Sequence, residues 1–128
     1  MLAASDFVLL LLPVTPDTEN FINTQRLSKM KPSAWLLNFA RGALIVDNDL
    51  IAAVKAKTIA GAVLDVFREE PLSATHAFWQ TEGILVLPHI GGGHPNRTDS
   101  VAELFAENAR RFINGEPLKA AVDRAHGY

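Results

Sequence analysis

The chain contains no cysteine among its 128 residues. This absence excludes disulfide bonds, thiolate nucleophiles and cysteine-based zinc sites, and it fits a reducing compartment. No spacing of histidine with acidic residues resembles a metal site, so we expect no bound metal. An excess of basic charge is also missing, because 12 Lys and Arg stand against 14 Asp and Glu. We therefore expect no nucleic-acid partner.

Long apolar runs and targeting signals are missing as well. The longest strongly apolar run covers residues 7–12, far fewer than the roughly 20 residues that a membrane-spanning helix needs. The segment 1–6 has no basic residue of the kind that begins a secretory signal peptide. We therefore expect a cytoplasmic protein without a membrane partner.

Short apolar stretches alternate with helical patterns along the chain. The strand candidates are residues 7–12, 34–39, 59–64 and 84–87. Continuous apolar stretches of this length are typical of strands covered on both faces in a parallel sheet. Asn23 or Thr24 can cap a short helix, and Asp47 can cap a second one. The alternation predicts an α/β fold, a Rossmann-like parallel sheet with flanking helices.

A longer helix is expected near the end of the chain, over about residues 96–114. Its apolar residues are Val101, Leu104, Phe105, Phe112 and Ile113, which fall on one side of the helix. Gly115 is a natural C-terminal stop.

Polar residues gather where the predicted strands end. They are Thr15, Asn38, Arg41, Asp65, Glu70 and His89. Because ligands of open parallel sheets bind at the carboxyl ends of the strands, this edge is the candidate site.

Two of these residues have both a functional and a structural interpretation. Arg41 can hold a carboxylate through two parallel hydrogen bonds, or it can pair with Asp47 or Asp49 at the next helix. Asp65 can accept a hydrogen bond from an amide, or it can cap the turn that follows it. The sequence pattern alone leaves both alternatives open.

His89 stands between a proline and three glycines at the end of the last predicted strand. Glycines allow a ligand or another backbone segment to approach closely. A carboxylate such as Glu70 beside the imidazole would favour its protonated form, which is the form of a general acid. A structural histidine at the end of a buried strand is the alternative.

Four motifs in order resemble the D-2-hydroxyacid dehydrogenase family. They are Leu12–Thr18 (LPVTPDT), Asn38–Gly42 (NFARG), Leu64–Leu72 (LDVFREEPL) and Leu87–Gly92 (LPHIGG). The ending VDRAHGY, residues 122–128, further resembles the glyoxylate/hydroxypyruvate reductase A branch of that family.

The resemblance implies an oxidoreductase that reduces a 2-oxoacid, such as glyoxylate or hydroxypyruvate, with NAD(P)H. Arg41 would bind the substrate, and His89, paired with Glu70, would donate the proton. Asp65 would accept from the nicotinamide carboxamide. The residues implied to contact the cofactor are Leu12, Pro13, Thr15, Phe39, Ala40, Asp65, Gly91 and Gly92. The cofactor would be NAD or NADP, with the branch favouring NADP, and the full-length form would be a homodimer.

The same resemblance assigns residues 1–94 to the C-terminal half of an NAD(P)-binding domain. Residues 95–128 would be a long helix and tail that returns towards the substrate domain in full-length relatives. The sequence contains no Gly-x-Gly-x-x-Gly, the motif that places a pyrophosphate at a helix N-terminus. We therefore expect a fragment that is inactive by itself. A non-enzymatic interaction module and an inactive structural remnant are the alternatives, and the joint presence of Arg41, Glu70 and His89 favours descent from an enzyme.

Overall fold

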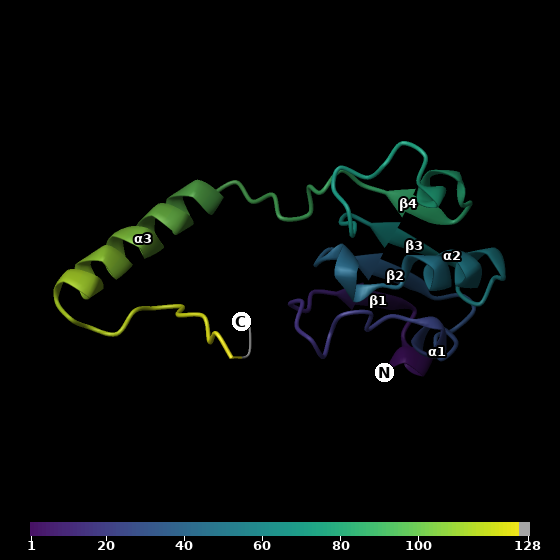
Figure 1. Ribbon diagram of the computed structural model, residues 1–128, viewed down its shortest axis with the longest axis horizontal. Coiled ribbons are helices and arrows are strands. Elements are labelled where there is room, and N and C mark those ends of the chain that lie inside the picture. Colours follow the sequence, from purple (N-terminus) through teal and green to yellow (C-terminus); the bar gives the residue numbers. More distant parts are fainter. Residues whose placement is uncertain (126–128) are drawn as a thin grey trace. The chain divides into compact units, whose positions relative to one another are not determined.

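The computed structural model describes residues 1–125, which form two units, one ending at Gly91 and one beginning at Gly92 (Figure 1). The first unit contains a parallel four-stranded sheet with the strands side by side in chain order. The strands are β1 (Phe7–Leu10), β2 (Trp35–Asn38), β3 (Gly61–Leu64) and β4 (Ile84–Val86). The predicted parallel α/β fold is confirmed, with each strand shorter than its apolar stretch.

One short helix precedes β1, and four others lie between the strands. They are η1 (Leu2–Ala4), α1 (Thr24–Leu27), η2 (Gly42–Leu44), α2 (Asp47–Lys55) and η3 (Ala77–Gln80). Asn23 caps α1, because its side chain accepts from the Arg26 amide at 3.2 Å. The expectation that Asp47 caps α2 is wrong: Val46 occupies the cap position and Asp47 is the first helical residue. The Asp47 carboxylate instead faces Arg68 and His76.

The core lies on one face of the sheet. In β1 and β2, alternate residues are buried, so that Val8 and Leu10 join Leu36 in a cluster with Leu50 and Val54 of α2. This burial of apolar side chains is the main stabilisation of the unit.

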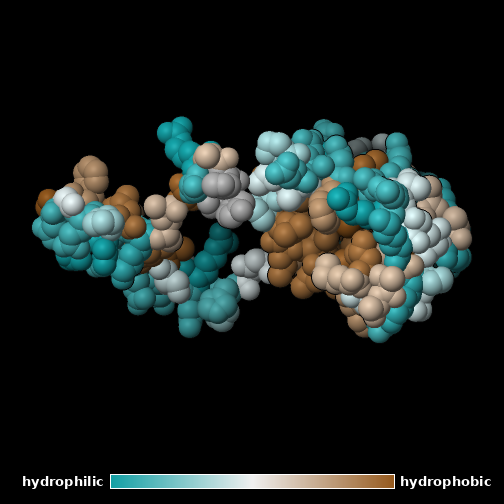
Figure 2. All heavy atoms as spheres, turned by 90° about the horizontal axis from the view of Figure 1, so that it is seen from below, coloured by the Kyte–Doolittle hydropathy of each residue, from teal (hydrophilic) through white to brown (hydrophobic). Residues whose placement is uncertain are grey.

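The other face of the sheet is partly open, so the expectation of strands covered on both faces is wrong. Leu9 pairs in register with Leu37, which pairs with Val63 and then with Leu85, so these four side chains form one row. Leu9 and Leu85 at the two ends of the row are exposed. Figure 2 shows that apolar side chains, in brown, reach the surface of this unit.

The second unit consists of α3 (Arg97–Ile113) and the segment after it. The expected long helix is confirmed, and Gly115 ends it with a φ of 67°. No residue of α3 is buried, so its apolar side chains have no core in this unit. No helix within residues 1–125 is long and apolar enough to cross a membrane.

Candidate functional site

The centre of the candidate site is a hydrogen-bonded pair, His89 with Glu70, between the loops that follow β3 and β4. His89 Nδ1 lies 2.7 Å from Glu70 Oε2, while Glu70 Oε1 accepts from the Phe67 amide at 2.8 Å. The Phe67 N–H, the hydrogen bond with His89 and the charge of Arg41 together hold the pKa of Glu70 below its usual value. An ionised carboxylate only accepts hydrogen bonds, so the proton between the two side chains belongs to His89 Nδ1. The Nε2 atom is thereby left for a ligand.

Asp65 lies directly after β3 and is buried, with 1% of its surface exposed. Its Oδ1 accepts from the Ile90 amide at 2.9 Å and its Oδ2 accepts from the Gly91 amide at 2.7 Å. Both donors are main-chain amides, so the functional interpretation of Asp65 as an acceptor for a ligand amide stays a prediction. The amides belong to the loop after β4, so the alternative of a cap on the following turn is wrong.

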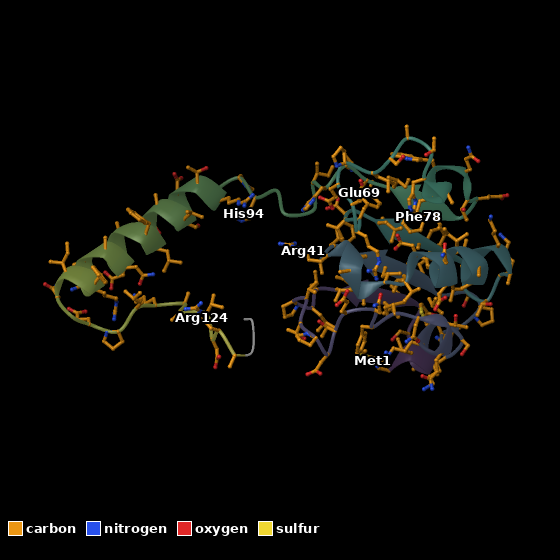
Figure 3. All side chains as sticks on the ribbon, viewed as in Figure 1. Met1, Arg41, Glu69, Phe78, His94 and Arg124 are labelled. Carbon is orange, nitrogen blue, oxygen red and sulfur yellow. The ribbon has the colours of Figure 1, made fainter. Side chains whose placement is uncertain are left out.

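Arg41 follows β2 and begins the turn into η2. Its Nη1 donates to the Ala40 carbonyl at 2.6 Å, and Figure 3 shows the side chain projecting outward from the sheet unit. The predicted alternative of a pair with Asp47 or Asp49 is wrong, because Asp47 faces Arg68 and His76 while Asp49 accepts from the Thr24 amide. The outward guanidinium is available to bind an anion.

Asn38 shapes the loop that presents Arg41. This fully buried residue accepts from the Ala40 amide at 3.1 Å and donates to the Arg41 carbonyl at 2.9 Å. A polar residue at the end of an apolar strand was the signal that marked Asn38 in the sequence. Its two local hydrogen bonds give that position a structural reason.

Arg68 is a site residue that the sequence interpretation missed. Its guanidinium donates to the carbonyls of Ile45 and Ala43 and to the side chain of Asn20. It therefore ties the loop after β3 to the loop that follows Arg41. No sequence signal could identify it, because backbone carbonyls are available at every position.

A hollow of about 330 Å³ lies beside the His89–Glu70 pair. Its walls are mostly apolar and come from the loops around Phe67, Leu72 and Leu87, with Glu70 and His89 at one side. Trp79 also lines it, and its indole N–H donates to the Ser73 carbonyl at 2.9 Å. The sequence interpretation did not place Trp79 at the site.

The residues expected to contact a cofactor lie after three strands of the same sheet. Leu12, Pro13 and Thr15 follow β1, Phe39 and Ala40 follow β2, and Gly91 and Gly92 follow β4. Because the strands are parallel, β1, β2 and β4 end at one edge. The Thr18 hydroxyl donates to the Pro13 carbonyl at 2.7 Å, which fixes the loop after β1.

These residues fit one end of a dinucleotide. Leu12 and Val14 expose apolar surface, against which a flat ring can pack, beside the polar groups of the site. No helix of the described part begins at a glycine-rich phosphate loop. Within residues 1–125, no group of His, Cys, Asp and Glu could hold a metal ion.

An α/β sheet with its polar groups at the carboxyl edge defines a Rossmann-like ligand-binding domain. Residues 1–91 match the NAD binding domain of the D-isomer specific 2-hydroxyacid dehydrogenases, and the chain belongs to this family.

The curated relatives are longer than this chain. Glyoxylate/hydroxypyruvate reductase A of Photorhabdus laumondii is 40% identical over 127 residues, which are 99% of this chain and 40% of the relative. Glyoxylate reductase of Thermococcus onnurineus is 41% identical over 124 residues, which are 97% of this chain and 37% of the relative. The chain thus spans about 40% of the length of such relatives.

Solved structures of the same family have the same fold. A D-isomer specific 2-hydroxyacid dehydrogenase from Xanthobacter autotrophicus Py2, in complex with NADPH and MES, is 39% identical with a TM-score of 0.91. The similarity covers 99% of this chain and 52% of that one. The NADPH-dependent glyoxylate/hydroxypyruvate reductase of Sinorhizobium meliloti, in complex with NADP and sulfate, is 31% identical with a TM-score of 0.89, over 99% of this chain and 41% of that one. The predicted family and fold are confirmed, and the roles of individual site residues stay predictions.

Proposed function

We propose that the chain is the proton-donating part of an NAD(P)-dependent reductase that converts a 2-oxoacid into the D-2-hydroxyacid. The observation that carries this proposal is the 2.7 Å pair of His89 with Glu70, at the sheet edge where Arg41 projects outward. Glyoxylate and hydroxypyruvate are the proposed substrates, since the reductases of Photorhabdus laumondii and Sinorhizobium meliloti carry those names.

His89 is the proposed general acid. Glu70 holds Nδ1 and stabilises the positive charge of the ring, so Nε2 can donate its proton to the carbonyl oxygen of the substrate. The nicotinamide cofactor, when bound, supplies the hydride that adds to the carbonyl carbon. The imidazole ends the step neutral, with its remaining proton on Nδ1 towards Glu70.

Arg41 is the proposed anchor for the substrate carboxylate. Its guanidinium can form two parallel hydrogen bonds with a carboxylate, which orients the neighbouring carbonyl. Asn38 keeps the loop of Arg41 in place through its two hydrogen bonds.

The proposed cofactor is NAD or NADP, and NADP is favoured because the Xanthobacter and Sinorhizobium structures contain NADPH or NADP. Leu12, Pro13, Thr15, Phe39, Ala40, Gly91 and Gly92 are the proposed lining. Asp65 would contribute a remaining lone pair to the nicotinamide carboxamide, since each of its oxygens already accepts one amide.

We also propose that residues 1–94 are the C-terminal half of the NAD(P)-binding domain and that residues 95–128 return towards a substrate domain. The fraction of the relatives that the chain spans, 37–41%, supports this division of roles. On this proposal the isolated chain does not turn over glyoxylate, and the complete enzyme is a cytoplasmic homodimer.

A chimera tests the proposed function. Residues 1–128 replace the matching 40% of the Photorhabdus reductase, and NADPH-dependent reduction of glyoxylate is followed. We expect His89→Ala to lower kcat by about 10²–10⁴-fold while NADPH binding persists, because a general acid contributes that much. His94→Ala, which changes an exposed histidine of the second unit, is the control and should leave kcat unchanged. Equal loss of NADPH binding in His89→Ala would contradict the assignment of the proton donor.

A further inference from the structure

The turn that carries His89 has a backbone conformation that needs support. His89 has a φ of 55°, in the left-handed region that residues other than glycine rarely adopt. Such a conformation persists only where the surrounding structure fixes it. The next two residues, Ile90 and Gly91, both direct their amides at the carboxylate of Asp65.

We propose that Asp65 is a positioning residue that acts through His89, by holding the backbone of residues 88–91 so that the imidazole meets Glu70. This consequence for catalysis rests on the proposed function, whereas the hold on the turn does not. The inference gives Asp65 a role that is separate from any contact with the cofactor.

Burial of Asp65 is the first support. An ionised carboxylate taken out of water needs strong compensating partners. Within residues 1–125, Asp65 has no ion pair at 4.0 Å or less, and the hydrogen bonds recorded for its oxygens come from the two amides. Hydrogen bonds to an ionised acceptor are stronger than those between neutral groups. The turn and the carboxylate therefore stabilise each other.

The fit of Gly91 is the second support. A Cβ atom on Gly91 would lie 2.4 Å from Cδ1 of Phe39 and 2.9 Å from Oδ2 of Asp65. The backbone of the turn is thus pressed against the ends of β2 and β3, at a distance that only glycine permits. This close approach is what brings the Gly91 amide to 2.7 Å from Asp65.

The third support is that one segment holds the turn at two points. Asp65 and Glu70 belong to the same loop after β3. Asp65 holds the main chain just after His89, and Glu70 holds the ring of His89. Without the main-chain contact to Asp65, the backbone of His89 would no longer be held where Glu70 can bind the ring. The His89–Glu70 pair therefore depends on Asp65 as well as on Glu70.

Hydrogen exchange of the unaltered chain is the first test. Ile90 is 63% exposed and Gly91 is exposed too, so their amides would exchange quickly without Asp65. We expect both amides to exchange about tenfold or more slowly than the amide of Gly92, because a hydrogen-bonded amide is protected until the bond opens. Exchange of Ile90 and Gly91 at the rate of an unprotected amide would overturn the proposal, whatever happens to any variant.

Nitrogen NMR of the His89 ring is the second test. Asp65→Asn keeps the shape of the side chain, but its amide NH2 group faces one of the two main-chain N–H donors, Ile90 or Gly91, and cannot accept from it. We expect its His89 Nδ1 signal to move towards the position seen in Glu70→Gln. Asp49→Asn is the matched control, because Asp49 also accepts one backbone amide, that of Thr24 at 2.7 Å, and it should leave the His89 signal unchanged. A folded Asp65→Asn chain with an unchanged His89 signal would overturn the proposal.

The two readouts separate this inference from the proposed function. Protection of the amides and the His89 signal need no cofactor or substrate. If both behave as expected while His89→Ala in the chimera keeps full activity, the hold on the turn stands and the proton-donor assignment fails. If Asp65→Asn does not fold, the exchange experiment on the unaltered chain decides.

Discussion

The two units of the chain contain helices of opposite character. Helix α2 has 9 residues and buries Leu50, Ala53 and Val54 against the sheet, whereas α3 has 17 residues and buries none. Ile113 at the end of α3 is 82% exposed. Length alone therefore does not measure how firmly a helix is held, since helical stability in proteins comes mostly from packing of an apolar face.

Charged contacts take the place of a core in the second unit. Glu107 forms ion pairs with Arg110, Arg111 and Lys119. The hydrogen bonds of Arg110, then those of Arg111, lower the pKa of Glu107 to about 2. Asn108 also exchanges two hydrogen bonds with the backbone of Lys119, so the tail is fastened to the helix. Each such exposed contact contributes less to the free energy of folding than the burial of one leucine side chain does.

The strongest way to break the first unit is to remove a core side chain. Leu36 in β2 is fully buried, and Leu36→Ala should lower the free energy of unfolding by about 2–5 kcal/mol through lost burial and a cavity. Ile113→Ala, the control in α3, should change it by less than about 0.5 kcal/mol, as is usual for exposed positions. Urea unfolding of the whole chain, followed by tryptophan fluorescence, measures both. Equal effects would show that α3 is as well packed as β2.

Glycine positions give a second contrast between the units. A Cβ on Gly42 would lie 2.0 Å from the backbone carbon of Phe67, so Gly42→Ala must separate the loops after β2 and β3. We expect a loss of about 1–3 kcal/mol, the usual cost of an overpacked site.

Gly92→Ala is the matched control for Gly42→Ala, because its Cβ meets no described atom within 4 Å. Thermal unfolding of the two variants should differ by several degrees, since about 1 kcal/mol shifts the midpoint of a domain of this size by about 4 °C. An unchanged midpoint for Gly42→Ala would mean that the two loops can part freely.

Local patterns were sufficient for the strands and for the edge that carries the site. The apolar stretches around Leu36 and Leu64 identified β2 and β3, and the parallel arrangement placed His89 and Glu70 at one edge. The prediction that both faces of the strands are covered was wrong at Leu9, which is exposed. The apolar stretch itself does not show which other parts of the chain cover it. Arg68 was missed for a related reason, since its partners, two main-chain carbonyls and the side chains of Asn20 and Asp47, lie far from it in the sequence.

The carboxylate of Glu70, which pairs with His89, should make stability depend on pH. The pKa of Glu70 is lowered in the folded chain, so its stabilisation is complete above the usual pKa of a glutamate and is lost as pH falls through the lowered value. Glu70→Gln should be less stable than the unaltered chain near neutral pH by less than about 1 kcal/mol, because the pair is partly exposed. Urea unfolding at a series of pH values should show the two chains converging in acid.

Glu69→Gln is the control for Glu70→Gln, since Glu69 is exposed and next to it in the sequence. Its stability relative to the unaltered chain should not change over the same pH range. The free energies of unfolding of Glu70→Gln and the unaltered chain could instead differ by the same amount at every pH, including the most acid. That result would show that folding does not stabilise the ionised form of Glu70.

The smallest expected effect concerns the charges of α3. Salt at about 1 M should reduce the helical signal of the unaltered chain slightly, because the ion pairs of Glu107 are exposed and therefore screened. Glu107→Gln should begin from a slightly lower helical signal and respond less to salt, while Glu103→Gln, a matched change on the same helix, should behave like the unaltered chain. Far-ultraviolet circular dichroism measures all three.

Acid should lower the helical signal in the same way as salt. Because the pKa of Glu107 is about 2, this loss of helical signal appears only as pH falls through that value. If Glu107→Gln leaves both the signal and its salt response unchanged, the ion pairs do not hold α3, and its contrast with the sheet unit needs another physical cause.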